Sequence, residues 1–113
     1  MTSGVLHDAI AERRLTLVSG AGEARDIVVR IGKPESSPDR VDFSCACQIV
    51  GLGEDSVKRI YGVDAFQSLQ LTLRFISMML NHHQKESQGR IYWLEPGDDL
   101  GFVQNEPSST SGR

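Results

Sequence analysis

The sequence predicts an α+β fold, in which an antiparallel sheet of about five strands carries one long helix packed across one face. Apolar and polar residues alternate in the first half of the chain, as they do in half-buried strands. After residue 64 the apolar spacing becomes helical. The chain has 113 residues, which is enough for a single domain with one modest core.

The strands are predicted by alternation with a period of two. Five segments show it, the fourth of them weakly: 12–18, 25–31, 41–50, 56–62 and 90–94. Stretches rich in glycine, or in proline and serine, separate the first four and supply the turns. In the third segment Phe43, Cys45, Cys47 and Ile49 share one face, which we expect to be buried.

A helix is expected from Ala65 to about His83. Asp64 can cap its first turn, and Gln67 lies three residues later, as a capping box requires. The polar stretch at 85–90 contains a glycine and is expected to end the helix. We therefore divide the chain into an N-terminal segment (1–9), one α+β domain (10–103) and a disordered C-terminal tail (104–113).

The predicted helix is apolar on two sides, if each residue advances by about 100°. One stripe has the spacing of a helix packed on a sheet: Phe66, Leu69, Leu73, Ile76 and Leu80. A second stripe lies further round the helix: Leu71, Phe75, Met78 and His82. Burial of a large apolar side chain is worth about 1.5–3 kcal/mol, so the second stripe needs its own cover. Either residues 4–10 or the loop at 33–40 cover it, or another protein does, a second copy included.

Composition and charge exclude several function classes. The formal net charge is −3 and no basic stripe is visible, so we expect no nucleic-acid partner. No apolar run approaches the roughly 20 residues of a membrane span, and the N-terminus lacks the pattern of a signal peptide. Two cysteines separated by one residue form no disulfide framework. These features indicate a cytoplasmic protein.

No motif predicts catalytic, cofactor-binding or metal-ligating residues. Cysteine and histidine are the usual ligands of zinc, but Cys45 and Cys47 share an apolar strand face. His82 and His83 leave the helix about 100° apart, so they do not easily converge on one ion. The glycines at 51–53 lack the third glycine of a dinucleotide fingerprint and precede a strand. We expect no metal and no cofactor.

Three blocks of sequence resemble a known family. They are IAERRLTL at 10–17, QIVGLG at 48–53 and YGVDAFQSLQLTL at 61–73. They look like recurring blocks of a family of small bacterial domains of unknown function, and the similarity covers roughly residues 10–103. The resemblance implies a bacterial origin and a compact α+β domain. The family has no assigned activity or catalytic residues, so the resemblance implies none here.

These observations favour a non-catalytic protein-interaction domain over an enzyme. Its interface is expected at Leu71, Phe75, Met78 and His82, and it binds either itself, as a homodimer, or another protein, in the manner of an immunity or antitoxin protein. The alternative is a small-molecule-binding domain, with a pocket between sheet and helix near Tyr61, Tyr92 and Trp93.

Overall fold

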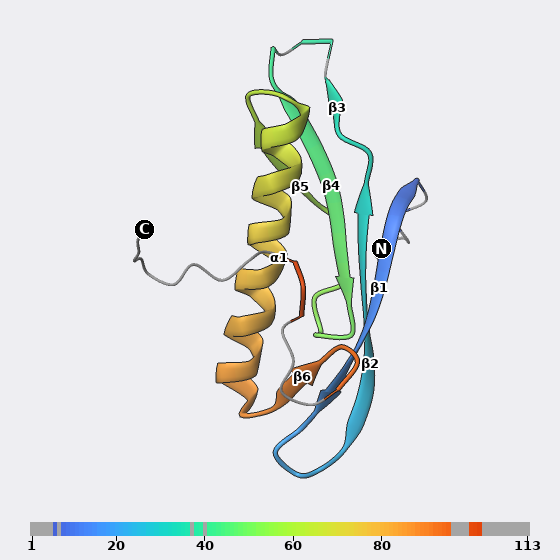
Figure 1. Ribbon diagram of the computed structural model, residues 1–113, viewed down its shortest axis with the longest axis vertical. Helices are drawn as coiled ribbons and strands as arrows, with labels where there is room; N and C mark the ends of the chain where they lie inside the picture. Colours follow the sequence, from blue (N-terminus) through green and yellow to red (C-terminus); the bar gives the residue numbers. More distant parts are fainter. Residues whose placement is uncertain (1–5, 7, 37, 40, 96–99, 103–113) are drawn as a thin grey trace.

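The computed structural model describes residues 6, 8–36, 38–39, 41–95 and 100–102, and they form two layers, a sheet and one helix beside it (Figure 1). The elements, in chain order, are β1 (Ala9–Val18), β2 (Ala24–Gly32), β3 (Glu35–Ser36), β4 (Phe43–Val50), β5 (Lys58–Gly62), α1 (Ala65–Ser87) and β6 (Arg90–Tyr92). The predicted α+β class, with an antiparallel sheet and one long helix, is confirmed.

Every strand pair in the sheet is antiparallel. β2 lies between β1 and β4, β6 extends the sheet beyond β1, and β5 pairs with β4. The two-residue strand β3 was not predicted. It pairs with the start of β4, while β2 pairs with the end of the same strand. β3 therefore continues the path of β2 after an interruption at Lys33 and Pro34, because proline cannot donate to a strand ladder.

The helix α1 connects the two edges of the sheet. It follows β5, which pairs with β4, and precedes β6, which pairs with β1. The helix therefore crosses the sheet over β4, β2 and β1, and its contacts include β4, β5 and β6.

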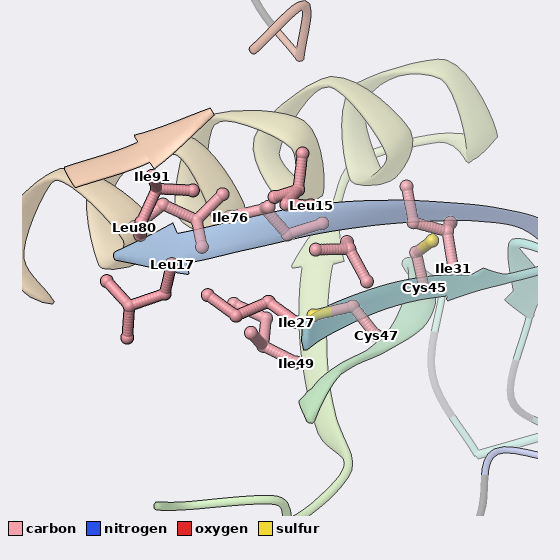
Figure 2. Packing of buried hydrophobic residues seen from close by; sticks show 11 residues of the cluster. Leu15, Leu17, Ile27, Ile31, Cys45, Cys47, Ile49, Ile76, Leu80 and Ile91 are labelled. Atoms are coloured by element: carbon pink, nitrogen blue, oxygen red, sulfur yellow. The ribbon is translucent and has the colours of Figure 1, made fainter. Parts of the chain in front are cut away.

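The core lies between α1 and the sheet (Figure 2). Its buried members are Leu15, Leu17, Ile27, Val29, Ile31, Cys45, Cys47, Ile49, Ile76, Leu80 and Ile91. On β1, β2 and β4 these are alternate residues, so the period of two correctly predicted the face that meets the helix.

Small residues let the start of α1 approach the sheet closely. Ser68 and Thr72 are fully buried. Their hydroxyl groups donate to backbone carbonyls one turn earlier on the helix, so they need no partner in the sheet. Gly62, at the end of β5, lies so close that a β-carbon there would be 2.5 Å from the backbone nitrogen of Ser68.

The helix begins where it was predicted to begin. Asp64 is the N-cap, and its Oδ1 accepts the backbone N–H of Gln67 at 2.8 Å. The side chain of Gln67 accepts the N–H of Val63 rather than that of Asp64, which displaces one bond of the expected capping box by one residue.

The predicted end of the helix was four residues too early, because α1 continues to Ser87. The residues after His83 are compatible with a helix, and the stop comes from Gln88, which adopts a left-handed conformation (φ 58°). Gly89 follows, where a β-carbon would lie 2.9 Å from the carbonyl oxygen of Val18.

The predicted core stripe of the helix is partly wrong. The buried positions recur at every fourth residue: Ser68, Thr72, Ile76 and Leu80. Leu69 and Leu73 are half-buried beside them, whereas Phe66 is 78% exposed. Phe66 lies about 200° round the helix from Ser68, so the close approach of Ser68 to the sheet turns Phe66 towards solvent.

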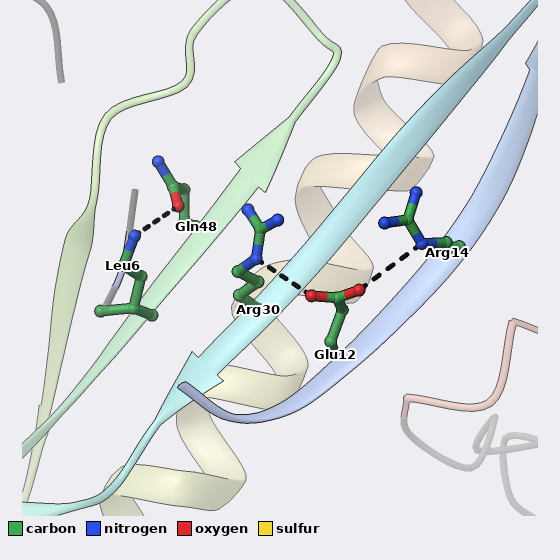
Figure 3. Close-up of polar contacts among 5 residues, drawn as sticks. All are labelled: Leu6, Glu12, Arg14, Arg30 and Gln48. Atoms are coloured by element: carbon green, nitrogen blue, oxygen red, sulfur yellow. Dashed lines mark hydrogen bonds and ion pairs between the residues drawn. The ribbon is translucent and has the colours of Figure 1, made fainter. Parts of the chain in front are cut away.

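The first described residues lie against the other face of the sheet (Figure 3). The backbone nitrogen of Leu6 donates to Oε1 of the buried Gln48 at 3.0 Å. Nε2 of Gln48 donates to the carbonyl oxygen of Asp55 at 2.8 Å. Nearby, Glu12 pairs with Arg30 and Arg14. Gln48 thus connects β4 to the N-terminal segment and to the β4–β5 connection.

At the other end of the chain, residues 100–102 pack beside β1. The Arg13 guanidinium carbon lies 3.7 Å from the centre of the Trp93 ring and 5.1 Å from that of Phe102. Nη1 of Arg13 also donates to the carbonyl oxygen of Leu100 at 2.7 Å. The predicted tail at 104–113 lies outside the described residues, as do residues 1–5 of the predicted N-terminal segment.

Candidate functional site

A cleft of about 110 Å³ opens between α1 and the β4–β5 connection, and we call it the α1–β4 cleft. Five apolar residues line it: Cys47, Ile49, Leu52, Phe75 and Met79. Five polar residues complete the lining: Glu54, Ser56, Lys58, His82 and His83. An apolar hollow with a few polar groups is the usual form of a ligand site.

Three parts of the chain position the apolar lining. Cys47 and Ile49 come from the helix-facing side of β4, and Phe75 and Met79 lie one turn apart on α1. Leu52 comes from the connection after β4, which begins with a sharp turn. There Gly51 has φ 115°, and a β-carbon would lie 2.6 Å from the carbonyl oxygen of Asp26. Only glycine fits this position without strain, so Gly51 fixes the path that brings Leu52 over the core.

Two of the polar lining residues, Glu54 and Lys58, form an ion pair with each other. Glu54 accepts a hydrogen bond from the Ser56 hydroxyl and lies 3.3 Å from Nζ of Lys58. The Ser56 hydroxyl, followed by Lys58, lowers the pKa of Glu54. In the part of the chain that the structure describes, no side-chain hydrogen bond or ion pair engages the imidazoles of His82 and His83.

The thiol at the base of the cleft is unsuited to nucleophilic chemistry. Burial raises the pKa of Cys47 to about 11, the neighbouring Cys45 raises it further, and Lys58 opposes the shift. Burial also raises the pKa of Cys45. A thiol is a nucleophile or a metal ligand only as the thiolate, so both cysteines are neutral core residues at physiological pH.

Cys47, His82 and His83 line the same cleft, which the sequence did not indicate. Among the described residues, however, no group of three or more His, Cys, Asp or Glu side chains could hold a metal ion. The cleft is therefore described by its apolar lining and its hydrogen-bonding groups.

The four predicted interface residues differ in their burial. Phe75 is half-buried, packs against the core and lines the cleft. Leu71 and Met78 are 36% and 60% exposed, and His82 is exposed. A shallow hollow on the outside of the helix is lined by Arg74, Ser77, Met78, Asn81, His82 and Lys85. His82 thus borders both this hollow and the cleft.

Phe75 is half-buried within the chain, where it packs against the core. Leu52, from the β4–β5 connection, lines the same cleft. Met78 remains largely uncovered by the residues that the structure describes, and Leu71 is partly uncovered. The predicted surplus of apolar surface on α1 is therefore smaller than the sequence indicated, and it is confined to the outward side.

The residues predicted for a ligand pocket are not brought together. Tyr61 lies on β5, Tyr92 lies on β6, and these strands are at opposite edges of the sheet. Trp93 follows β6, and its ring is stacked on Arg13. A second hollow, of about 170 Å³, lies beside this stack and is lined by Ala11, Glu12, Arg13, Val29, Ile31, Leu73, Gly101 and Phe102.

Sequence reasoning missed Leu52 and Met79 as lining residues of the cleft. A signal for Leu52 existed, since it is a large apolar residue inside a glycine turn, where polar residues are usual. Met79 belongs to neither of the two predicted stripes, and no pattern within the helix indicates that it lines a cleft with the β4–β5 connection.

Comparison with known proteins identifies a family. The family model for a domain of unknown function, DUF6968, matches residues 11–104. This match confirms the resemblance seen in the sequence and covers the helix and every strand except the first two residues of β1. No curated protein and no solved structure matches the chain. In the described part of the chain, no helix is both long and apolar enough to cross a membrane.

Proposed function

The chain belongs to the DUF6968 family of domains of unknown function, and we propose that it is a non-catalytic protein-interaction domain. The observation that carries the proposal is the outer face of α1, which we define as Leu71, Arg74, Met78, Asn81, His82 and Lys85. Apolar and polar side chains mix on this face without a cover from the described residues, as at a protein interface.

Burial and charge both support this reading. A methionine is well suited to a recognition surface, because its flexible thioether adapts to different contours, and Met78 is 60% exposed. From Ala65 to Lys85 the helix contains no acidic residue, whereas the whole chain has a net charge of −3. Within the helix sequence, Arg74 and Lys85 of this face therefore have no acidic residue before Glu86.

The charge favours a different protein over a second copy. Two copies of the face meeting across a two-fold axis would bring Arg74 towards its own equivalent and would supply no carboxylate to either. A partner with apolar and acidic side chains would satisfy both Met78 and Arg74. An immunity or antitoxin protein, which works by covering its partner, is one class that fits this description.

The proposal is tested by placing a photoreactive residue at position 78 and capturing proteins from the native host. The captured protein is then purified, and its affinity is measured by calorimetry for the wild type and for Met78→Asp. We expect the acidic substitution to weaken binding at least about 30-fold, the lower limit for an interface hot spot.

Val41→Asp provides the control, because Val41 is 97% exposed and lies outside α1. It should leave the affinity unchanged. Light scattering of the wild type distinguishes the homodimer, which would appear as twice the monomer mass. A partner that binds Met78→Asp as tightly as the wild type would show that the outer face is not the interface.

A further inference from the structure

We propose that the α1–β4 cleft binds a small organic carboxylate with an apolar body. The site differs from the outer face of α1, with which it shares only His82, since it lies between the helix and the β4–β5 connection and its apolar lining faces inward. The inference therefore does not depend on the proposed protein partner.

The size of the cleft fits one ring or a short branched chain. A cavity of about 150 Å³ lined by Leu, Ile and Phe side chains stays dry and takes up a benzene molecule. The α1–β4 cleft has a volume of about 110 Å³ and a comparable lining of Ile49, Leu52, Phe75 and Met79. Phe75 offers a ring for stacking, and Met79 a thioether that adapts to the ligand.

The polar groups around the cleft favour an acceptor at the other end of the ligand. His82 and His83 carry ring N–H groups that no described side chain uses. Lys58 carries an ammonium group that pairs with the exposed carboxylate of Glu54. Exposed ion pairs contribute little and exchange readily, so the Lys58 ammonium can turn to a ligand carboxylate.

A cationic ligand fits less well. The acid that lines the cleft, Glu54, already accepts from Ser56 and pairs with Lys58. Both donors bind Oε2 of Glu54, so an amine that approached this carboxylate would meet the Lys58 ammonium beside it. A carboxylate instead meets three side chains that can donate hydrogen bonds to it, those of Lys58, His82 and His83. The cleft therefore favours a carboxylate over an amine.

The test uses phenylacetate, with benzylamine and benzyl alcohol as probes that keep the ring and change the polar end. Calorimetry and thermal unfolding are measured with the full chain. We expect phenylacetate to raise the melting temperature by about 5–10 °C at tenfold excess over its Kd. Benzylamine should give no shift, and benzyl alcohol a smaller one.

Two pairs of variants locate the site. Met79→Trp fills the cleft and should abolish phenylacetate binding, whereas Met78→Trp, on the outward side of the helix, should leave it intact. Lys58→Gln should weaken binding about tenfold, as expected for loss of one charge-assisted contact. Lys85→Gln should have no effect, because Lys85 does not line the cleft.

Amide chemical shifts of the wild type give a readout that does not depend on how the variants fold. Phenylacetate should change the amide chemical shifts of Leu52, Met79 and His83. Equal binding of benzylamine and phenylacetate would overturn the assignment of a carboxylate. Absence of any response at about 10 mM phenylacetate, above the millimolar range of weak ligands, would overturn the site itself. Met78→Asp, which tests the protein partner, should not change phenylacetate binding.

Discussion

Gly62 shows how a single residue sets the distance between the helix and the sheet. Its missing side chain leaves room for the first turn of α1, where the nearest atoms belong to the backbone of Gln67 and Ser68. Backbone atoms within a helix cannot move singly, so a methyl group at this position must push the whole turn away from β5.

We therefore expect Gly62→Ala to destabilise the protein by about 1–3 kcal/mol, the usual cost of overpacking a core. The measurement is unfolding in urea. Gly20→Ala is the matched control, because a β-carbon there meets nothing closer than the carbonyl oxygen of Gln88 at 3.5 Å. If both variants lost the same stability, the cost would reflect glycine replacement in general rather than the approach of α1.

Cys47 makes the stability depend on pH in the alkaline range. Burial holds its pKa at about 11 in the folded state, against an ordinary value of 9.0. The unfolded chain therefore loses this proton first, and the stability that the neutral thiol contributes is present below pH 9. It is lost as the pH rises from about 9 to 11, at about 1.4 kcal/mol per pH unit.

Urea unfolding of the wild type and Cys47→Ala between pH 8 and 11 measures this contribution. Lysines and tyrosines titrate in both proteins, so the difference between the two curves isolates Cys47. We expect the wild type to lose stability more steeply over this range. Parallel curves would show that Cys47 ionises in the folded state as easily as in the unfolded chain.

At the scale of the element, α1 combines a buried line with an exposed side on the same turns. Leu80 is fully buried among core residues, whereas Met78 is largely exposed. We expect Leu80→Ala to cost about 2–5 kcal/mol, and Met78→Ala to change the stability by no more than about 0.5 kcal/mol. A loss of several kcal/mol for Met78→Ala in the purified protein would mean that another chain covers this side of the helix in solution.

The sequence predicted the helix and most of the strands well. It predicted the buried side of the strands better than the buried side of the helix. Alternation on a strand has only two outcomes, so Ile27 and Cys45 could be assigned to the core directly. A helix offers a continuous range of orientations, and the choice depends on its neighbours. Ser68 is buried because Gly62 admits it, and no apolar pattern within the helix indicates that a serine marks the buried line.

At the scale of the whole molecule, Arg13 attaches the C-terminal part of the described chain to β1. It stacks on Trp93 and binds the carbonyl oxygen of Leu100. We expect Arg13→Leu to release residues 100–102, with faster amide hydrogen exchange there and a change in Trp93 fluorescence. The loss in stability should be about 0.5–2 kcal/mol, as for a partly desolvated cation–π contact.

Arg14→Leu is the control, because Arg14 is on the same strand but pairs with Glu12 on the far face of the sheet. It should leave the exchange of residues 100–102 unchanged. Equal exchange in wild type and Arg13→Leu would show that Phe102 is held by apolar packing alone.

The candidate site was the least predictable feature, because it arises from contacts between distant parts of the chain. Tyr61 and Trp93 are aromatic residues close to the ends of predicted strands, and the strand order that separates them cannot be read from alternation. The cleft instead depends on Gly51, whose turn places Leu52 beside Met79. Its polar lining joins residues of the β4–β5 connection and the first residue of β5 to the last turns of α1, and only the folded chain brings them together.

The pairing of β1 with β6 also bears on the order of folding. β1 and β2 are neighbours in sequence and can pair as soon as both are synthesised, whereas β6 reaches β1 only after α1 has crossed the sheet. Contacts between distant parts of a chain are slow to form. On the ribosome, a β1–β2 hairpin would therefore leave Leu17 uncovered until Ile91 arrives. Completion of the sheet must then follow synthesis of nearly the whole domain, and a chain that ends before β6 should be a substrate for chaperones rather than a stable fragment.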